Sequence, residues 1–87
     1  MQIKFLTITK MIRPPKKRQL VFLQFISDFY QSNGIYPIHK EMAQHFGISM
    51  TAVQSMIARL ERDKWLLKNT RGVIIGITDK TFQFVKQ

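Results

Sequence analysis

The stretch HKEMAQHFGISMTAVQSMI, residues 39–57, contains the spacing that decides the fold of this chain. Ala43 is small enough for a following helix to pack closely against the helix that carries it. Gly47 can take the left-handed conformation that ends a helix. Ser49 can cap the next helix by accepting a hydrogen bond from a free backbone N–H. The spacing therefore predicts two helices that cross tightly at a short turn.

We expect the first of these helices to span about 38–46 and the second about 50–63. Apolar residues fill the positions that such a pair would bury, namely Met42, Phe46, Ile48, Val53 and Met56. In the second helix, the spacing i, i+3, i+4, i+7 turns one stripe inward, formed by Val53, Met56, Ile57 and Leu60. The outward residues are Met50, Thr51, Gln54, Ser55, Ala58 and Arg59. A helix-turn-helix of this kind places its second helix in the DNA major groove, whereas an ordinary helical hairpin leaves that face in solvent.

Five outward side chains can recognise base edges: Met50, Thr51, Gln54, Ser55 and Ala58. Gln54 can bond adenine through N6 and N7, whereas Thr51 and Ser55 can bond either base edge. Met50 and Ala58 can pack on a thymine methyl group. For each residue the alternative is a solvated helix face, and Met50 also suits a gap in the core.

The composition favours a nucleic-acid partner. The chain has 87 residues, enough for one small domain, and 14 Lys and Arg against 5 Asp and Glu give a formal net charge of +9. The cations lie at element ends and loops rather than on one helix face, which disfavours a membrane surface and favours a polyanion. The absence of cysteine excludes disulfides and thiolate metal sites, and it is compatible with a cytoplasmic protein. The apolar run 20–26 is too short to span a bilayer, which takes about 20 residues.

The N-terminal part predicts an extension and one further helix. Apolar and polar side chains alternate within residues 1–13, which is typical of a short strand. Pro15 can be the first residue of a helix that runs to about Ser32 and stops at Asn33 and Gly34. That helix is apolar around most of its surface, through Leu20, Phe22, Leu23, Phe25, Ile26, Phe29 and Tyr30. It must therefore be covered on more than one side.

The C-terminal part predicts a β-hairpin. Residues 65–67 and 73–77 suit two strands, and the sequence NTRG at 69–72 suits the turn between them. Apolar and polar residues alternate again over 81–86, which predicts another strand. The expected fold is α+β, a three-helix winged helix-turn-helix with a C-terminal hairpin wing. Its organisation is an N-terminal extension (1–13), a DNA-binding domain (14–78) and a C-terminal extension (79–87), with a strand in each extension.

Candidate contacts to the DNA backbone surround the helix pair: Lys16, Lys17, Arg18, Ser49, Arg59, Lys68, Thr70 and Arg71. The cluster 16–18 begins the first helix, where each positive charge opposes the helix dipole by ~0.3 to 1 kcal/mol at low salt. A phosphate contact explains this placement, and a charged, solvated linker is the alternative. The hairpin turn is also cationic, so it can lie along a neighbouring groove or phosphate strand. A solvated polar turn is the alternative there.

At these residues the chain resembles the N-terminal DNA-binding domain of LexA-type repressors, a winged helix-turn-helix. The resemblance covers about 17–77 and rests on Lys17, Gln19, Val21, Phe22, Ile26, Asp28, Gly34, Pro37, Glu41, Met42, Ala43, Gln44, Phe46, Gly47, Leu60, Arg62 and Leu66. It implies a DNA-binding transcriptional regulator. The turn before the second helix is one residue shorter than in that family, so no base preference transfers, and Lys64 stands where such folds usually have glycine. The matching residues do not include the protease domain of full-length repressors, so the resemblance does not imply autoproteolysis.

No catalytic site, metal site or cofactor is expected. Glu41 and His45 share a helix face at i, i+4, and with His39 they form a metal-like grouping that supplies too few ligands. The sequence contains no phosphate-binding glycine loop, nucleophile elbow or paired carboxylates. We therefore expect a protein that is not an enzyme.

The combined expectation is a transcriptional regulator of bacterial, phage or plasmid type that binds double-stranded DNA. Two alternatives stay open: a replication or partition initiator that binds DNA repeats, and a winged helix used for protein interaction or RNA binding. We also expect a homodimer through the terminal segments and the first helix, because a phenylalanine-rich edge strand needs a partner. Pairing of the two ends within one chain is the alternative to the dimer.

Overall fold

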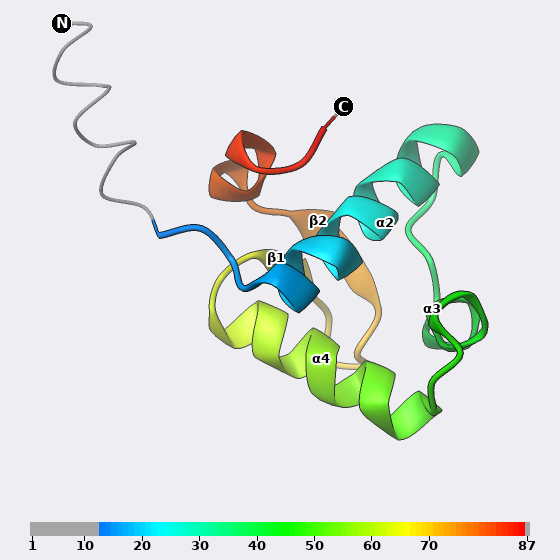
Figure 1. Cartoon of the computed structure of the whole chain (residues 1–87). Coiled ribbons are helices and arrows are strands. Elements are labelled where there is room, and N and C mark those ends of the chain that lie inside the picture. The colour runs from blue at the N-terminus through cyan, green and yellow to red at the C-terminus, as the bar shows by residue number, and fades with distance from the viewer. Residues whose placement is uncertain (1–12, 87) are drawn as a thin grey trace, which may run out of the picture.

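The computed structural model describes residues 13–86. Its elements are α2 (Lys17–Asn33), α3 (His39–Phe46), α4 (Met50–Arg62), β1 (Leu66–Lys68), β2 (Ile74–Ile77) and the 3-10 helix η1 (Asp79–Gln83). Figure 1 shows α2 lying across α4, with α3 beside the start of α4 and the two strands behind these helices. The strands form an antiparallel pair. The predicted α+β winged helix with a hairpin wing is confirmed.

The tight turn between α3 and α4 forms as predicted. Gly47 takes a φ of 65° after the last residue of α3. The Ile48 N–H then donates to the Ala43 carbonyl at 3.1 Å. Ser49 caps α4, because its Oγ accepts the Ala52 N–H at 3.1 Å. These contacts bring the first turn of α4 directly against the last turn of α3.

The start of α2 differs from the prediction. The helix begins at Lys17 rather than at Pro15, and Lys16 is its N-cap residue. The physical reason is Gln19, whose Oε1 accepts the backbone N–H of Lys16 at 3.0 Å and closes the first turn there. Pro15 is buried ahead of the helix instead. At the other end, Gly34 takes a φ of 74° and stops α2 as predicted.

One apolar core joins the helices, the hairpin and the tail. Its buried residues are Phe22, Leu23, Ile26, Met42, Val53, Ile57, Leu60, Trp65, Leu66, Ile74 and Val85. Phe22 of α2 stacks on Phe46 of α3 with ring centroids 4.2 Å apart. The stripe Val53, Ile57 and Leu60 of α4 lies in this core, and the opposite side of α4 is left to solvent.

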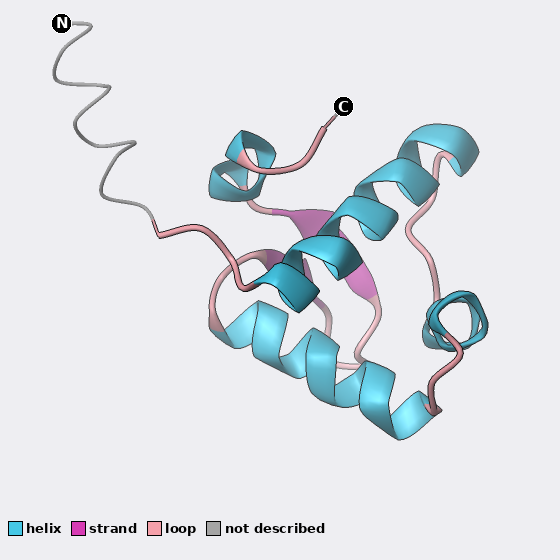
Figure 2. Ribbon diagram, viewed as in Figure 1, coloured by secondary structure: helices cyan, strands magenta, loops and turns pink. Residues whose placement is uncertain are grey.

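The wing is the short hairpin formed by β1 and β2 (Figure 2), and Asn69 and Gly72 shape its turn. Gly72 takes a φ of 82°, and its N–H donates to the Asn69 carbonyl at 3.0 Å. The Asn69 Oδ1 accepts the backbone N–H groups of Arg71 and Val73 at 2.9 and 3.0 Å. The side chain of Asn69 therefore fixes the turn, as asparagine commonly does.

The strand predicted over 81–86 is wrong, since the chain forms η1 at this place. The hydroxyl of Thr78 donates to the Lys64 carbonyl at 2.6 Å, and the hydroxyl of Thr81 donates to the Trp65 carbonyl. These two bonds hold the chain in a tight turn against the end of α4. Thr81 and Val85 are buried while Gln83 between them is exposed, whereas a strand would turn all three side chains to the same face.

The tail after η1 packs on α2. Phe84 lies edge-on to Trp65 with ring centroids 5.8 Å apart. The side chain of Gln24 bonds the backbone of Lys86 in both directions, accepting its N–H at 2.9 Å and donating to its carbonyl at 3.0 Å. The tail thus provides part of the extra cover that the apolar first helix requires. The predicted N-terminal strand lies outside the described residues.

Candidate nucleic-acid interface

The outward face of α4 is a continuous exposed surface. The predicted outward residues Met50, Thr51, Gln54, Ser55, Ala58 and Arg59 are all exposed. The predicted inward residues Val53, Ile57 and Leu60 are buried, and Met56 is partly buried against the core. Ala52 is also exposed and was missed. Its position three residues before Ser55 and seven before Arg59 would have placed it on this face.

A cation from α3 and a cation from the wing flank the start of α4. Lys40, Met50 and Arg71 line the same cleft. The prediction included Met50 and Arg71, but it missed Lys40. No local pattern marks Lys40, because only the packing of the wing on the first turn of α3 brings it near Arg71. The pair places positive charge beside the first residue of the exposed helix.

The three predicted contacts of the wing differ in their surroundings. Thr70 and Arg71 are exposed at the turn. The Nζ of Lys68 instead lies 3.8 Å from the Oε1 of Glu61 on α4, and its side chain is partly buried. A long, partly exposed ion pair of this kind contributes little to stability, but it directs Lys68 toward α4 rather than toward the tip of the wing.

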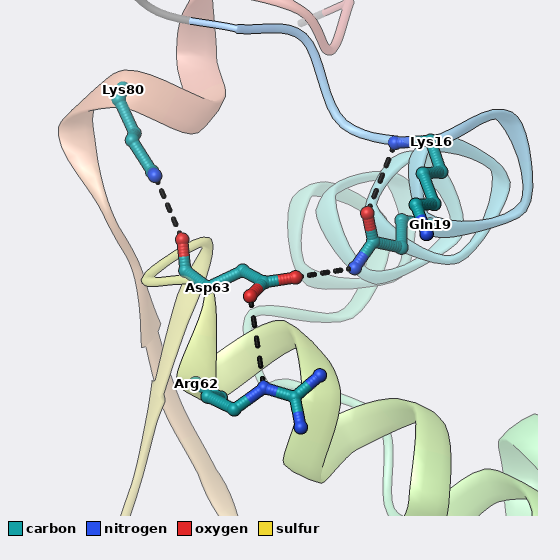
Figure 3. A network of polar contacts seen from close by, with 5 residues as sticks. All are labelled: Lys16, Gln19, Arg62, Asp63 and Lys80. Carbon is teal, nitrogen blue, oxygen red and sulfur yellow. Dashed lines mark hydrogen bonds and ion pairs between the residues drawn. The ribbon is translucent and has the colours of Figure 1, made fainter.

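The predicted basic cluster lies at the other end of α4. Lys16, Lys17 and Arg18 are exposed around the start of α2. Figure 3 shows that the start of α2 meets the end of α4, where Gln19 Nε2 donates to Asp63 Oδ2 at 3.0 Å. The guanidinium of Arg18 lies 5.5 Å from the centroid of the Phe22 ring, which keeps this side chain along the helix.

Two further cations surround Asp63 (Figure 3). Arg62 Nε lies 3.8 Å from its Oδ1, and Lys80 Nζ donates to its backbone carbonyl at 2.7 Å. The ammonium of Lys80 also lies 4.1 Å from the centroid of the Trp65 ring. The positive charges of Arg62 and Lys80 therefore exceed the single negative charge of Asp63, and this end of α4 is positively charged.

The two positively charged ends of α4 are far enough apart to contact phosphates on either side of a DNA groove. α4 has 13 residues, which at 1.5 Å per residue gives a length of about 20 Å. The major groove is about 12 Å wide. Cations at both ends of an inserted helix would therefore lie near the phosphates that border the groove, while the exposed side chains between them face the base edges.

Two residues of the metal-like grouping, Glu41 and His45, are engaged in other contacts. The Oε1 of Glu41 accepts the backbone N–H of Ile38 at 2.9 Å. The ring of His45 stacks on Phe25 with centroids 4.1 Å apart. Within residues 13–86, no three His, Cys, Asp or Glu residues are grouped so that they could hold a metal ion.

Of the helices in residues 13–86, none combines the length and the apolar character that crossing a membrane requires.

Burial raises the pKa of Tyr36, and the neighbouring Tyr30 raises it further. A tyrosine hydroxyl is already neutral at physiological pH, and both effects keep it neutral.

Comparison with known proteins agrees with this geometry. A family model described as the LexA DNA binding domain matches residues 13–72. This range contains α2, α3, α4, β1 and the turn of the wing, and all predicted DNA contacts from Lys16 to Arg71 fall within it. Comparisons with curated proteins and with solved structures give no match. The match identifies residues 13–72, with the three α-helices, β1 and the turn of the wing, as a DNA-binding domain.

Proposed function

Because this chain belongs to the LexA DNA-binding domain family, we propose that it recognises a specific double-stranded DNA sequence and regulates transcription. The observation that carries the proposal is the exposed face of α4, which lies between positively charged ends on a domain of this family. We place the protein among cytoplasmic regulators of bacterial, phage or plasmid type. It would repress a promoter wherever its binding site overlaps the site of transcription initiation.

We propose that base readout and backbone contact are divided between different residues. The proposed base readers are Met50, Thr51, Gln54, Ser55 and Ala58. The proposed backbone contacts are Lys16, Lys17, Arg18, Ser49, Arg59, Lys68, Thr70 and Arg71, to which the position of Lys40 adds one more. Side chains on the helix face differ in their base preferences, whereas cations at its ends attract phosphates of any sequence. This division supports specificity without requiring a cofactor.

Selection of bound fragments from a random duplex library, followed by a salt titration, tests the proposal. A palindromic consensus, with an affinity that falls steeply as salt rises, supports a dimeric regulator. A consensus of tandem direct repeats would replace the regulator by a replication or partition initiator. Absence of any enriched sequence would contradict sequence-specific binding and favour a protein-interaction or RNA-binding module.

We further propose that the protein binds DNA as a homodimer. The tail already covers part of α2, which leaves less of this helix free to pair with a second copy. The outer face of the hairpin therefore gives stronger support for a dimer than α2 does. Leu67 and Ile75 are 52% and 57% exposed on the hairpin, and the sheet has two strands in residues 13–86, which leaves both of its edges unpaired there. Exposed apolar strands of this kind favour pairing with a second copy.

Sedimentation equilibrium with and without the selected duplex tests the dimer. We expect Leu67→Asp to be monomeric where the parent chain is a dimer, since a buried carboxylate would have no partner. Val21→Asp, which changes an exposed apolar residue of α2, is the matched control and should leave the dimer intact. A parent chain that stays monomeric on the duplex would contradict the proposal.

A further inference from the structure

A cleft of about 250 Å³ lies between the first turn of α3, the first residue of α4 and the turn of the wing. Three of its apolar side chains are largely exposed: Ile38 at 54%, Met50 at 45% and Val73 at 46%. Small-molecule sites are typically concave and mostly apolar, with a few polar groups that fix the orientation of the ligand. The cleft therefore has apolar walls that the described chain leaves uncovered.

The charges around the cleft favour an anion. Lys40 and Arg71 line it, and the described residues that line it include no aspartate or glutamate. The nearest acidic residue of α3 is Glu41, whose Oε1 accepts the Ile38 N–H at 2.9 Å. The N-cap residue Ile38 has no polar side chain and gives α3 no side-chain cap. The carboxylate of Glu41 offsets the positive end of the α3 dipole, so Lys40 and Arg71 supply the positive charge that lines the cleft.

The side chain of His39 provides a second observation. His39 lines the same cleft, and its Nε2 is buried with no hydrogen-bond partner among the described residues. Its Cε1 lies 3.8 Å from the position where a side chain at Gly72 would begin, so the ring packs against the wing turn. A buried polar atom without a partner is costly, and a ligand oxygen would supply the missing partner.

We propose that this cleft binds a small organic carboxylate with an apolar body about the size of one aromatic ring. A dry apolar cavity of about 150 Å³ accepts benzene, so the larger volume here accommodates a ring that bears a carboxylate. The carboxylate pairs with Lys40 and Arg71, and the ring lies against Ile38, Met50 and Val73. Because Met50 and Arg71 are also proposed DNA contacts, the bound carboxylate competes with DNA and acts as an effector.

An NMR titration of the ¹⁵N-labelled chain without DNA tests the site. The probes are benzoate, benzyl alcohol, acetate and inorganic phosphate at constant ionic strength. We expect benzoate to shift the backbone amides of His39, Lys40, Met50 and Val73, and to bind at least about tenfold more tightly than each of the other three probes, since it alone offers both charge and ring. Equal binding of all three anions would reduce the cleft to a general phosphate contact and overturn the proposal, as would the absence of any shift.

A pair of matched variants locates the carboxylate. Lys40→Gln should weaken benzoate binding by about tenfold, the loss expected for one charged hydrogen bond. Lys17→Gln removes the same charge from the first turn of α2, outside the cleft, and should change it by less than about twofold. Equal effects of the two variants would show that benzoate responds to net charge alone, which would overturn the site.

The effect on DNA binding separates this proposal from the proposed function. Saturating benzoate should weaken binding of the selected duplex several-fold, because binding at competing sites is reciprocal. Unchanged DNA affinity would overturn the effector role. A chain that binds benzoate as described but selects no DNA sequence would contradict the proposed function and leave the ligand site standing.

Discussion

The side-chain amide of Gln19 donates to the carboxylate of Asp63 at 3.0 Å, joining the start of α2 to the end of α4. Gln19 is buried, and its carbonyl oxygen accepts the backbone N–H of Lys16. One side chain therefore determines where α2 begins and which part of α4 it meets. The basic cluster at 16–18 is placed beside the end of α4 by this contact.

Replacing Gln19 by Leu removes both hydrogen bonds and should lower the free energy of unfolding by about 1 to 3 kcal/mol, at about 0.5 to 1.5 kcal/mol for each bond. The value stays low because the Asp63 side chain is 43% exposed and can be solvated. Urea unfolding measures it. Gln44→Leu, on an exposed position of α3, is the control and should cost less than about 0.5 kcal/mol. Similar losses in both variants would mean that the contact has no structural role.

Replacing Gly47 by Val should destabilise the fold by about 1 to 3 kcal/mol. The cost comes from the backbone, since φ is 65° and a β-branched residue strongly disfavours that conformation. A Cβ atom at Gly47 would meet nothing within 4 Å, so the expected cost is attributed to the backbone conformation rather than to a clash of that atom. Gly47→Asn, a residue that tolerates this conformation, should cost less than Val. Unfolding curves that overlay for Val and the parent chain would refute the proposed strain.

Replacing Lys64 by Gly should stabilise the protein by up to about 1 kcal/mol. Lys64 has a φ of 64° at the end of α4, where its N–H and that of Trp65 donate to the carbonyls of Glu61 and Leu60, each at 2.9 Å. This arrangement normally uses glycine. Lys64→Ala removes the charge without relieving the backbone and serves as the control. If the melting temperature rises equally in both variants, the gain comes from removing the lysine charge rather than from relieving the backbone.

Replacing Val85 by Ala should cost about 1 to 2 kcal/mol, because Val85 is buried where the tail crosses α2. Phe82 is 41% exposed on η1, so Phe82→Ala should cost clearly less despite the larger side chain. Thermal unfolding of the two variants compares them. The opposite ranking would be expected of a tail that follows the strand pattern of alternating phenylalanines, and it would contradict the packing described above.

Local spacing in the sequence predicts the helix-turn-helix correctly. The turn at Ala43, Gly47 and Ser49 depends on residues a few positions apart, so local spacing predicts it correctly. The outward face of α4 follows from helical periodicity in the same way. The start of α2 is different, because it depends on Gln19. The carbonyl of Gln19 selects Lys16 as the N-cap residue, while its amide donates to Asp63, which is distant in the sequence.

The errors arise where distant contacts decide the structure. Alternation in the tail suggests a strand, but the hydroxyls of Thr78 and Thr81 bond carbonyls at the end of α4, and these partners outweigh the local pattern. The approach of Lys40 to Arg71 depends on how the wing packs on α3. Neither contact leaves a signal in the residues near it along the chain.

The central claim is that α4 reads bases while the cations at its ends hold the backbone. The most direct measurement compares Gln54→Ala with Lys17→Ala and Arg71→Ala by selection from random duplexes and by salt titration. We predict that Gln54→Ala loses discrimination at one base position, by ~1 to 3 kcal/mol. Lys17→Ala and Arg71→Ala should weaken all sequences alike and reduce the salt slope by about one. An unchanged consensus for Gln54→Ala, together with an altered consensus for Lys17→Ala, would contradict the account.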